Sequence, residues 1–190
     1  MKLVIFMRIT LDTIVKDNDP ILRTKSEDVK LPLSMEDRQL LNDMITYVRD
    51  STDPELAELY NLRPAVGIAA IQVGVPKKML AIVIHEEEET IEHLLVNPRI
   101  VSNSTQYAYL KMGEGCLSVV DPYEGYVPRA ARVTVEGFDA LKNQMVRIRA
   151  RGYEAIVLQH EMDHFKGTLF YDHINKSDPF KEIENAIVIE

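Results

Sequence analysis

The sequence predicts an α+β fold in which a mostly antiparallel β-sheet packs around a late helix, with helices ahead of the sheet. Three observations predict it: apolar residues at helical spacing near the N-terminal end, a series of short strand-like runs between residues 79 and 151, and one amphipathic run bracketed by glycines afterwards. Strands connected by short polar turns favour antiparallel pairing over parallel crossovers.

The front helix is predicted over about residues 35–50. Ser34 precedes Asp37 by three residues, a spacing that resembles a capping box. The apolar residues that follow recur every three or four positions: Leu40, Leu41, Met44, Ile45 and Val48.

Short strands are predicted at residues 80–84, 94–96, 106–110, 132–136 and 145–149. The last two alternate apolar and polar residues about a polar turn, which is typical of a hairpin. The acidic run at residues 86–89 is predicted to be a solvated loop between two apolar strands.

The late helix is predicted between Gly152 and Gly167, over residues 153–166. Its spacing places four residues on one face: Ile156, Val157, His160 and His164.

Length and composition indicate one domain over residues 1–190. The chain has 190 residues, of which 46% are hydrophobic and 27% charged, and a chain of this size buries roughly 70% of its unfolded surface. A net charge of −8 argues against a nucleic-acid partner, because binding to phosphates relies on Lys and Arg.

The sequence also favours the cytoplasm. A single cysteine excludes an internal disulfide and suits a reducing compartment. The apolar runs at 65–71 and 79–84 are too short to cross a membrane, which takes roughly 18 to 20 residues. The run at 3–7 is shorter than the roughly 7 to 15 apolar residues of a secretory signal.

The late helix carries the pattern H-E-x-x-H, from His160 to His164. Four residues at 3.6 per turn bring the two imidazoles onto one face, where both can reach one metal ion. Glu161, beside the first histidine, is placed to face a water held by that ion.

A third ligand is required, because catalytic metal sites usually have three protein ligands and one open position. Glu182 or Glu184, downstream, is one solution, although little chain remains to carry it back. Cys116 is the alternative that the residues favour, because an acid and two glycines precede it in Gly113-Glu114-Gly115-Cys116 and let the backbone come close.

A third segment, residues 65–72, is apolar, rich in small residues, and ends in an amide side chain. Beside a metal, Gly67 would allow close approach of a substrate. Gln72 would offer an N–H donor to a developing oxyanion.

Together the three segments resemble the peptide deformylase family, which carries G-x-G-x-A-A-x-Q, E-G-C-x-S and H-E-x-D-H in this order. Residues 114–118 and 160–164 match in full, and the first motif matches except that Ala65 replaces its opening glycine. The resemblance extends from about residue 19 to 171. The long segment before Ala65 and the strand-like tail at 186–189 resemble the longer subtype of Gram-positive bacteria.

The resemblance implies removal of the formyl group from the N-terminal formylmethionine of newly made proteins, with release of formate. It implies that Cys116, His160 and His164 hold the metal. Glu161 would move the proton, and the oxyanion would be held by the metal, Gln72 and the backbone N–H of Leu117.

The resemblance also implies roles for the neighbouring residues. Glu114 and Asp163 would orient the loop and the ligands. Ile156 and Val157 would line an apolar pocket for methionine. The remaining substrate contacts are assigned to Gly115 and to Val66 and Gly67, which would pair with the substrate backbone as an added strand.

Spacing alone favours zinc, whereas the resemblance implies ferrous iron as the physiological metal, with zinc, nickel or cobalt able to occupy the site. The implied partners are N-formylmethionyl nascent peptides, with transient ribosome association, no membrane and no specific nucleic acid, in the bacterial cytoplasm.

Two alternatives stay open. A zinc peptidase shares H-E-x-x-H but takes its third ligand downstream, so the Cys116 segment separates the two readings. A deformylase-like protein that binds N-termini without turnover is the other, and only Ala65 supports it.

Overall fold

The computed structural model describes residues 8–190, so the apolar run at 3–7 lies outside the described residues. The α-helices are α1 (Met35–Ser51), α2 (Pro54–Tyr60) and α3 (Gly152–His164). The strands are β1 (Gly67–Ala69), β2 (Met79–His85), β3 (Thr90–Asn103), β4 (Tyr107–Leu110), β5 (Arg129–Ala130), β6 (Arg132–Asp139), β7 (Gln144–Arg151) and β8 (Ile187–Ile189).

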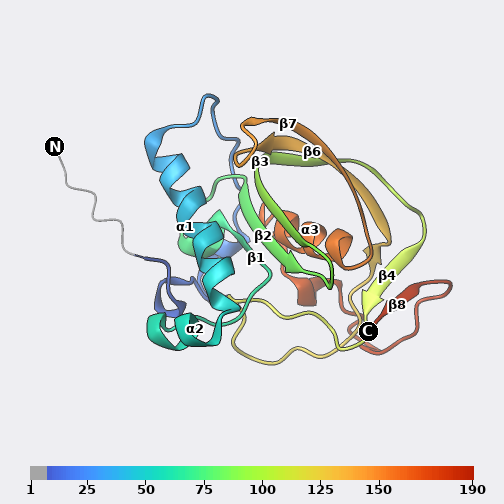
Figure 1. The fold of residues 1–190 in the computed structure, drawn as a ribbon. Helices are drawn as coiled ribbons and strands as arrows, with labels where there is room; N and C mark the ends of the chain where they lie inside the picture. The colour runs from blue at the N-terminus through green and yellow to red at the C-terminus, as the bar shows by residue number, and fades with distance from the viewer. Residues whose placement is uncertain (1–7) are drawn as a thin grey trace.

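Two sheets surround α3, and the predicted fold class is confirmed (Figure 1). A five-stranded sheet has the order β1-β2-β3-β6-β7 and a three-stranded sheet the order β5-β4-β8. All neighbouring strands of the larger sheet are antiparallel, and β8 runs parallel to β4 in the smaller one. The predicted strand-like tail is therefore a sheet strand.

The front helix α1 confirms the prediction, but its cap is only half of a capping box. Oγ of Ser34 accepts a 3.1 Å hydrogen bond from the backbone N–H of Asp37. The Asp37 carboxylate does not return to the Ser34 backbone; it accepts a 2.6 Å bond from Nζ of Lys77 instead. The side chain of Asp37, which a capping box would use at the helix terminus, thus links α1 to the segment that precedes β2.

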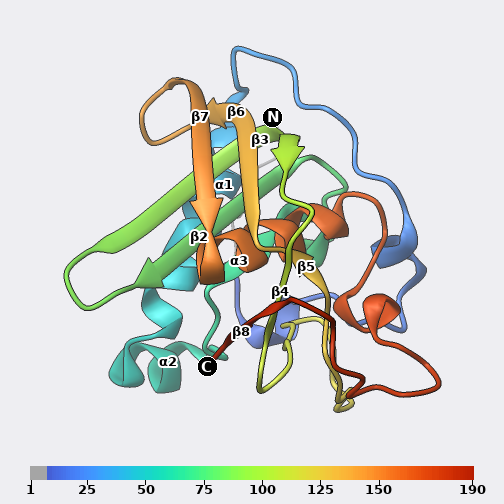
Figure 2. The same ribbon diagram turned by 90° about the vertical axis from the view of Figure 1, so that its right-hand side faces the viewer.

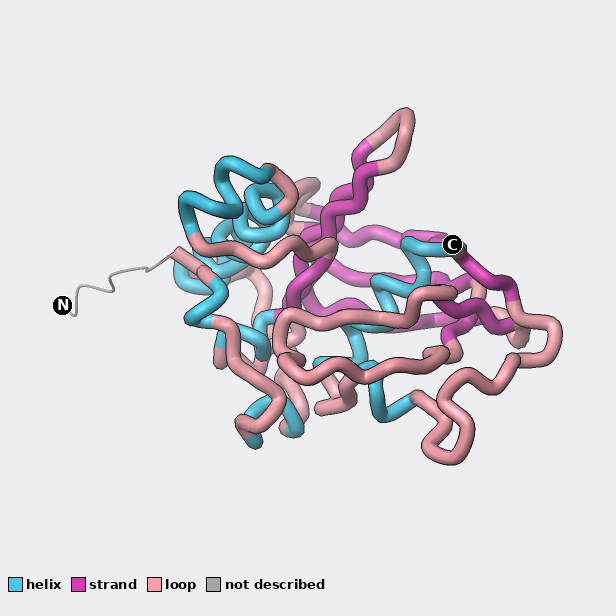
Figure 3. Tube along the Cα trace, turned by 90° about the horizontal axis from the view of Figure 1, so that it is seen from below, coloured by secondary structure: helices cyan, strands magenta, loops and turns pink. Residues whose placement is uncertain are grey.

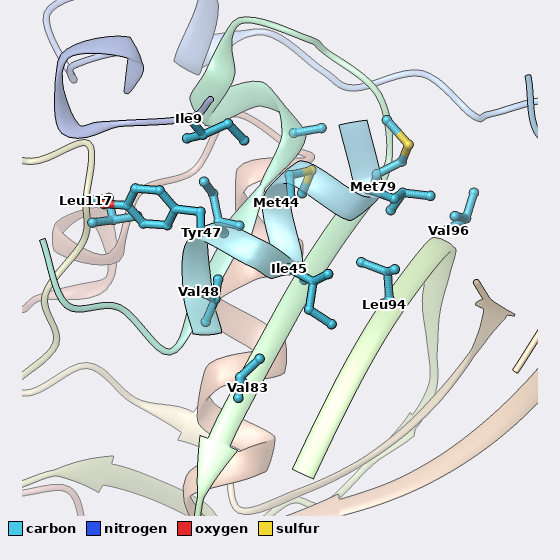
Figure 4. Close-up of a cluster of buried hydrophobic side chains, with 14 of the residues drawn as sticks. Ile9, Met44, Ile45, Tyr47, Val48, Met79, Val83, Leu94, Val96 and Leu117 are labelled. Carbon is cyan, nitrogen blue, oxygen red and sulfur yellow. The ribbon is translucent and has the colours of Figure 1, made fainter. Parts of the chain in front are cut away.

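Strand β2 separates the two main cores because its alternate residues face opposite sides. Met79, Ala81 and Val83 pack with α1 (Figure 4). Leu80, Ile82 and Ile84 belong to the cluster that includes α3. The helices α1 and α3 consequently cover opposite faces of the larger sheet.

The late helix α3 is packed from two sides. Ala155 and Leu158 lie in the cluster shared with the larger sheet, whereas Ile156 packs with Ala108 of β4 and with Ala131. Figure 2 shows β4 and β8 lying beside α3, apart from the larger sheet. The helix α3 is therefore in contact with both sheets.

Both predicted hairpins are confirmed. In β6–β7, Thr134 lies opposite Arg149. The exposed loop at 86–89 joins β2 to β3. The strand β3 is much longer than the predicted 94–96, because it continues past Pro98 through register shifts that break the alternation of the sequence.

The helix α2 and the short β5 are elements that the sequence analysis did not predict. Helix α2 is capped at its N-terminal end by Asp53, whose Oδ1 accepts from the N–H groups of Glu55 and Leu56, and at its C-terminal end by left-handed Asn61. Figure 3 shows long loops on the side of the sheet away from α1 and α2. Within residues 8–190, no helix has the length and apolar character needed to cross a membrane.

Candidate active site

Three side chains that could hold a metal ion, two of them on α3, form a cluster. Ligand atoms of Cys116, His160 and His164 lie within 4.8 Å of one another, and Sγ of Cys116 is 3.5 Å from Nε2 of His164. The i, i+4 spacing on α3 brings the two imidazoles together, as predicted. Cys116 enters from residues 111–128, a loop without helix or strand.

The donor set fits a transition metal ion. One thiolate and two imidazoles suit zinc or iron, and ligand atoms at these separations can surround one cation. Burial alone would raise the pKa of Cys116, but the adjacent His164 and His160 lower it well below its usual value, which favours the ligating thiolate. Glu182 is exposed and, within the described chain, no acid joins the cluster.

A buried chain of charges supports His160 from behind. Nδ1 of His160 lies 2.8 Å from Oε2 of Glu114, and Nε and Nη2 of Arg129 donate 2.9 Å bonds to the two oxygens of Glu114. Nη1 of Arg129 donates to Asp163, whose Oδ2 is 2.7 Å from Nε2 of His173. Both carboxylates predicted to orient the ligands therefore belong to one network.

The two carboxylates of this network are ionised. Burial would raise the pKa of Glu114, but hydrogen bonds from Arg129 and His160 outweigh burial and lower it to about 2. For Asp163, burial likewise acts upward, and the bonds with His173 and Arg129 hold its pKa below the usual range. A charged Glu114 accepts the Nδ1 proton of His160, which leaves Nε2 free to ligate.

Arg129 and His173 were missed by sequence reasoning. Arg129 follows a loop proline without any periodic signal, and His173 is an isolated histidine of the kind usually found at a surface. No local pattern marks either residue, because their partners lie 10 to 34 residues away.

Glu161 faces the site as an unpartnered carboxylate. Its side chain is buried, and Oε2 has no hydrogen-bond partner among the described residues. Burial raises its pKa to about 7, against the opposing effect of the neighbouring His160 and His164. A methyl group built on Gly67 would lie 2.5 Å from Oε1 of Glu161. The space that the absent side chain leaves at Gly67, which was predicted to admit a substrate, is therefore occupied in part by Glu161.

Gln72 presents its amide nitrogen to the cluster. Its Oε1 accepts a 2.8 Å bond from the N–H of Ala69, which fixes the orientation of the amide. Nε2 then lies 3.2 Å from Oγ of Ser118 and 3.4 Å from Sγ of Cys116. Leu117, next to Cys116, is buried.

A pocket of about 300 Å³ opens onto this cluster. Its lining includes all five residues predicted to bind substrate: Val66, Gly67, Gly115, Ile156 and Val157. It also includes residues that the sequence analysis did not assign to substrate: Thr52, Arg63, Pro64, Leu110 and Tyr153. His164 and Asp163 lie outside this lining and are buried.

One wall of the pocket is the open edge of β1. In the larger sheet β1 has β2 as its only neighbour. The N–H of Val83 donates a 2.9 Å bond to the carbonyl of Val66, and antiparallel pairs alternate between bonded and non-bonded. The N–H and C=O of the next residue, Gly67, therefore point away from β2, toward the pocket.

Comparison with known proteins agrees with this geometry. The family model described as polypeptide deformylase matches residues 11–180. Peptide deformylase 2 of Bacillus subtilis is 50% identical over 185 residues, covering 96% of this chain and 99% of that protein. Peptide deformylase of Oceanobacillus iheyensis is 46% identical, covering 96% and 100%.

Solved structures show the same similarity. A class I type b peptide deformylase from Acinetobacter baumannii, bound to Met-Ala-Ser, superposes with a TM-score of 0.69 at 30% identity, covering 88% of this chain and 100% of that one. The agreement in motifs, fold and extent shows that this chain belongs to the polypeptide deformylase family, the metal-dependent hydrolases that remove the N-formyl group from nascent peptides.

Proposed function

We propose that residues 1–190 form a single catalytic domain in which Cys116, His160 and His164 hold the metal. The observation that carries this proposal is the convergence of three ligand atoms within 4.8 Å of one another, beside the unpartnered carboxylate of Glu161. A downstream-ligand peptidase is not favoured, because Glu182 and Glu184 are exposed and stand outside the cluster. A non-catalytic binder is not favoured either, because the side chains that the reaction needs are all present.

Glu161 is proposed as the group that moves the proton. When bound at the cluster, a divalent cation supplies Lewis acidity, which polarises a carbonyl oxygen and makes a water molecule acidic. Glu161 takes the proton of the attacking water and delivers it to the methionine nitrogen as the C–N bond breaks. Water and the formamide thereby become a free amine and formic acid, which releases its proton to solvent as formate.

Two donors are proposed to stabilise the oxyanion that develops on the formyl oxygen. Gln72 donates from Nε2, which already faces the cluster, and Leu117 donates from its backbone N–H. Because both donors are buried and held in place before the substrate arrives, little reorganisation accompanies the reaction.

The substrate is proposed to bind as an extra strand on β1. Gly67, and Val66 through its N–H, pair with the peptide backbone from one wall, whereas the Val66 carbonyl stays bonded to Val83. Gly115 approaches the peptide from the other wall. Ile156 and Val157, one helical turn before His160, line the pocket for the methionine side chain. Glu114 and Asp163 orient the ligands through the network with Arg129.

We propose ferrous iron as the physiological metal, with zinc, nickel or cobalt as replacements. A single thiolate among imidazoles accepts any of these ions. Ferrous iron is supported only by the family resemblance, so metal analysis must decide it.

Transient ribosome association in the bacterial cytoplasm is proposed because the substrates are nascent peptides. A supporting feature is the outer face of β6–β7, where Arg132 lies opposite Arg151 and beside Arg149. Directly opposed like charges destabilise a sheet, so binding of a polyanionic partner would reduce the repulsion between these arginines. Cosedimentation with ribosomes, compared between the wild type and Arg149→Glu, tests it; equal cosedimentation would refute a role for this face.

The experiment that tests the function combines metal analysis with turnover. Protein purified without oxygen should contain iron in near-equal amount to the chain and release formate from formyl-Met-Ala-Ser. Absence of formate release from protein loaded in turn with iron, zinc, nickel and cobalt would overturn the proposal.

A further inference from the structure

The segment that precedes β1 continues the wall of the pocket from Gly67, beside the cluster, back to Arg63. Beyond Gly67 in the other direction, Ala69 is fully buried and its N–H is engaged by Gln72, so a peptide cannot leave that way. The pocket wall instead runs along residues 63–67. At about 3.3 Å per residue this wall is roughly 13 Å long, enough for two or three substrate residues beyond formylmethionine.

Arg63 bridges the two walls at the far end of this path. Two hydrogen bonds fix the backbone of Arg63 to Tyr47. The Tyr47 hydroxyl donates to the Arg63 carbonyl at 3.1 Å and accepts from the Arg63 N–H at 3.2 Å. Nη1 of Arg63 donates a 3.3 Å bond to the carbonyl of Val119, in the loop that carries Cys116. The side chain therefore lies where the exiting peptide must pass.

The charge of Arg63 is not neutralised by the described part of the protein. Arg63 is exposed, and within residues 8–190 its side chain bonds only to Val119 and forms no ion pair. Lys16, whose Nζ donates to the carbonyl of Leu117 at 3.3 Å, is a second cation nearby: burial, and then the charge of Arg63, lower its pKa. Asp12 acts on Lys16 but is not paired with either cation.

The acids of the pocket lie at its other end. The carboxylate of Glu114 is hydrogen-bonded to Arg129 and His160, and Glu161 is buried at the cluster. A chain with a net charge of −8 thus presents unpaired positive charge at the exit of its substrate path. Such a charge attracts acidic side chains and repels basic ones.

We propose that Arg63 makes this site selective for substrates that carry an acidic side chain in the second or third residue. The proposal rests on the proposed function, since it assumes that the peptide follows β1. It assigns to Arg63 a part in specificity and none in the chemical step.

The test uses the metal-loaded wild-type protein and amidated peptides, so that no terminal carboxylate interferes. Formyl-Met-Ala-Xaa and formyl-Met-Xaa-Ala amides are compared with Xaa as Glu, Gln or Lys. In at least one series, kcat/KM should favour Glu over Lys by about 3- to 10-fold, mainly through KM, and 1 M salt should shrink the ratio.

Variants separate the effect of the Arg63 charge from that of the protein's overall electrostatic field. Arg63→Gln should bring the Glu-to-Lys ratio within about 2-fold, Arg63→Glu should reverse it, and Arg63→Lys should keep its direction. Arg149→Gln, which removes one exposed charge on β7, is the matched control and should keep the wild-type ratio. The Arg149→Gln control should turn over the Gln peptides at the wild-type kcat.

Binding of the deformylated products, Met-Ala-Glu amide against Met-Ala-Lys amide, gives the same comparison by calorimetry without turnover. The proposal is overturned if the Glu-to-Lys ratio is the same in the wild type and in Arg63→Gln. It is also overturned if the wild type prefers Glu neither in kcat/KM nor in product binding. Product discrimination that depends on Arg63 but without any formate release would support it while contradicting the proposed function.

Discussion

Gly67 and Glu161 approach so closely that a Cβ on the glycine would lie 2.5 Å from Oε1 of the glutamate. Gly67 is not among the described glycines with positive φ, so the backbone conformation does not require glycine here. Space does: β1 packs directly against α3, and the glutamate occupies the volume that any side chain would take. The first motif and the third are thus coupled through one contact.

Gly67→Ala should therefore disable the reaction without releasing the metal. The added methyl must push the buried carboxylate away, and a displacement of this kind can cost about 10²-fold in rate. Formate release and metal content should be measured together. Gly115→Ala is the comparison for fold and metal content, because nothing lies within 4 Å of its added methyl; full activity in Gly67→Ala would contradict this account.

Cys116→Ala should strip the metal, because two imidazoles alone leave the site underfilled. Elemental analysis per chain measures this directly. Glu182→Ala and Glu184→Ala should retain the metal, since both acids are exposed and outside the cluster. Full occupancy in Cys116→Ala would show that the ligand set is wrong.

Glu161→Gln should keep the fold and the metal while turnover falls by about 10²- to 10⁴-fold. An amide fits the same space and can donate a hydrogen bond, but it cannot carry the proton from water to the amine. Melting temperature, metal content and kcat are the required measurements. Activity within a few-fold of the wild type would mean that another group is the base.

The local elements could be predicted because their signals are local. The spacing of Leu41, Met44 and Val48 defines α1, and the alternation along β6 and β7 defines a hairpin with one exposed face. The length of β3 could not be predicted, because bulges around Pro98 break its alternation. Nor could the division of the strands into two sheets, because the smaller sheet pairs β4 with the distant β5 and β8.

The same division holds at the site. The convergence of Cys116, His160 and His164 beside Glu161 was predictable, because H-E-x-x-H places the histidines by helical geometry and the glycines mark Cys116. The position of Arg129 at the site was not predictable, because its ion pairs with Glu114 and Asp163 form only when the fold brings these distant residues together. Charge networks that join distant segments leave no periodic trace in a sequence.

Formyl-Met peptides should be hydrolysed far faster than acetyl-Met peptides. The carbonyl must fit among the cluster, Gln72 and Leu117, of which only His160 is partly exposed, and an acetyl methyl would enter space that the formyl hydrogen leaves nearly empty. Formate and acetate release from the same peptide sequence provide the measurement. Comparable rates would indicate a general amidase with a looser site.

Ala65 is the one departure from the family's first motif, and the structure indicates what its methyl does. Ala65 is not among the described non-glycine residues with positive φ, which confirms that alanine is not strained there. It lines the pocket, and its N–H donates a 3.1 Å bond to Oγ of Ser51. The methyl should therefore narrow the pocket rim.

Ala65→Gly should lower KM for substrates with a bulky second residue. It should also lower stability slightly, by about 0.4 to 1 kcal/mol, because glycine gives the unfolded chain more freedom and no strain is relieved in return. Thermal melting and kinetics over a series of second residues test both parts. A clear rise in melting temperature with unchanged substrate preference would mean that glycine relieves strain at this position after all, and that the methyl does not shape the pocket.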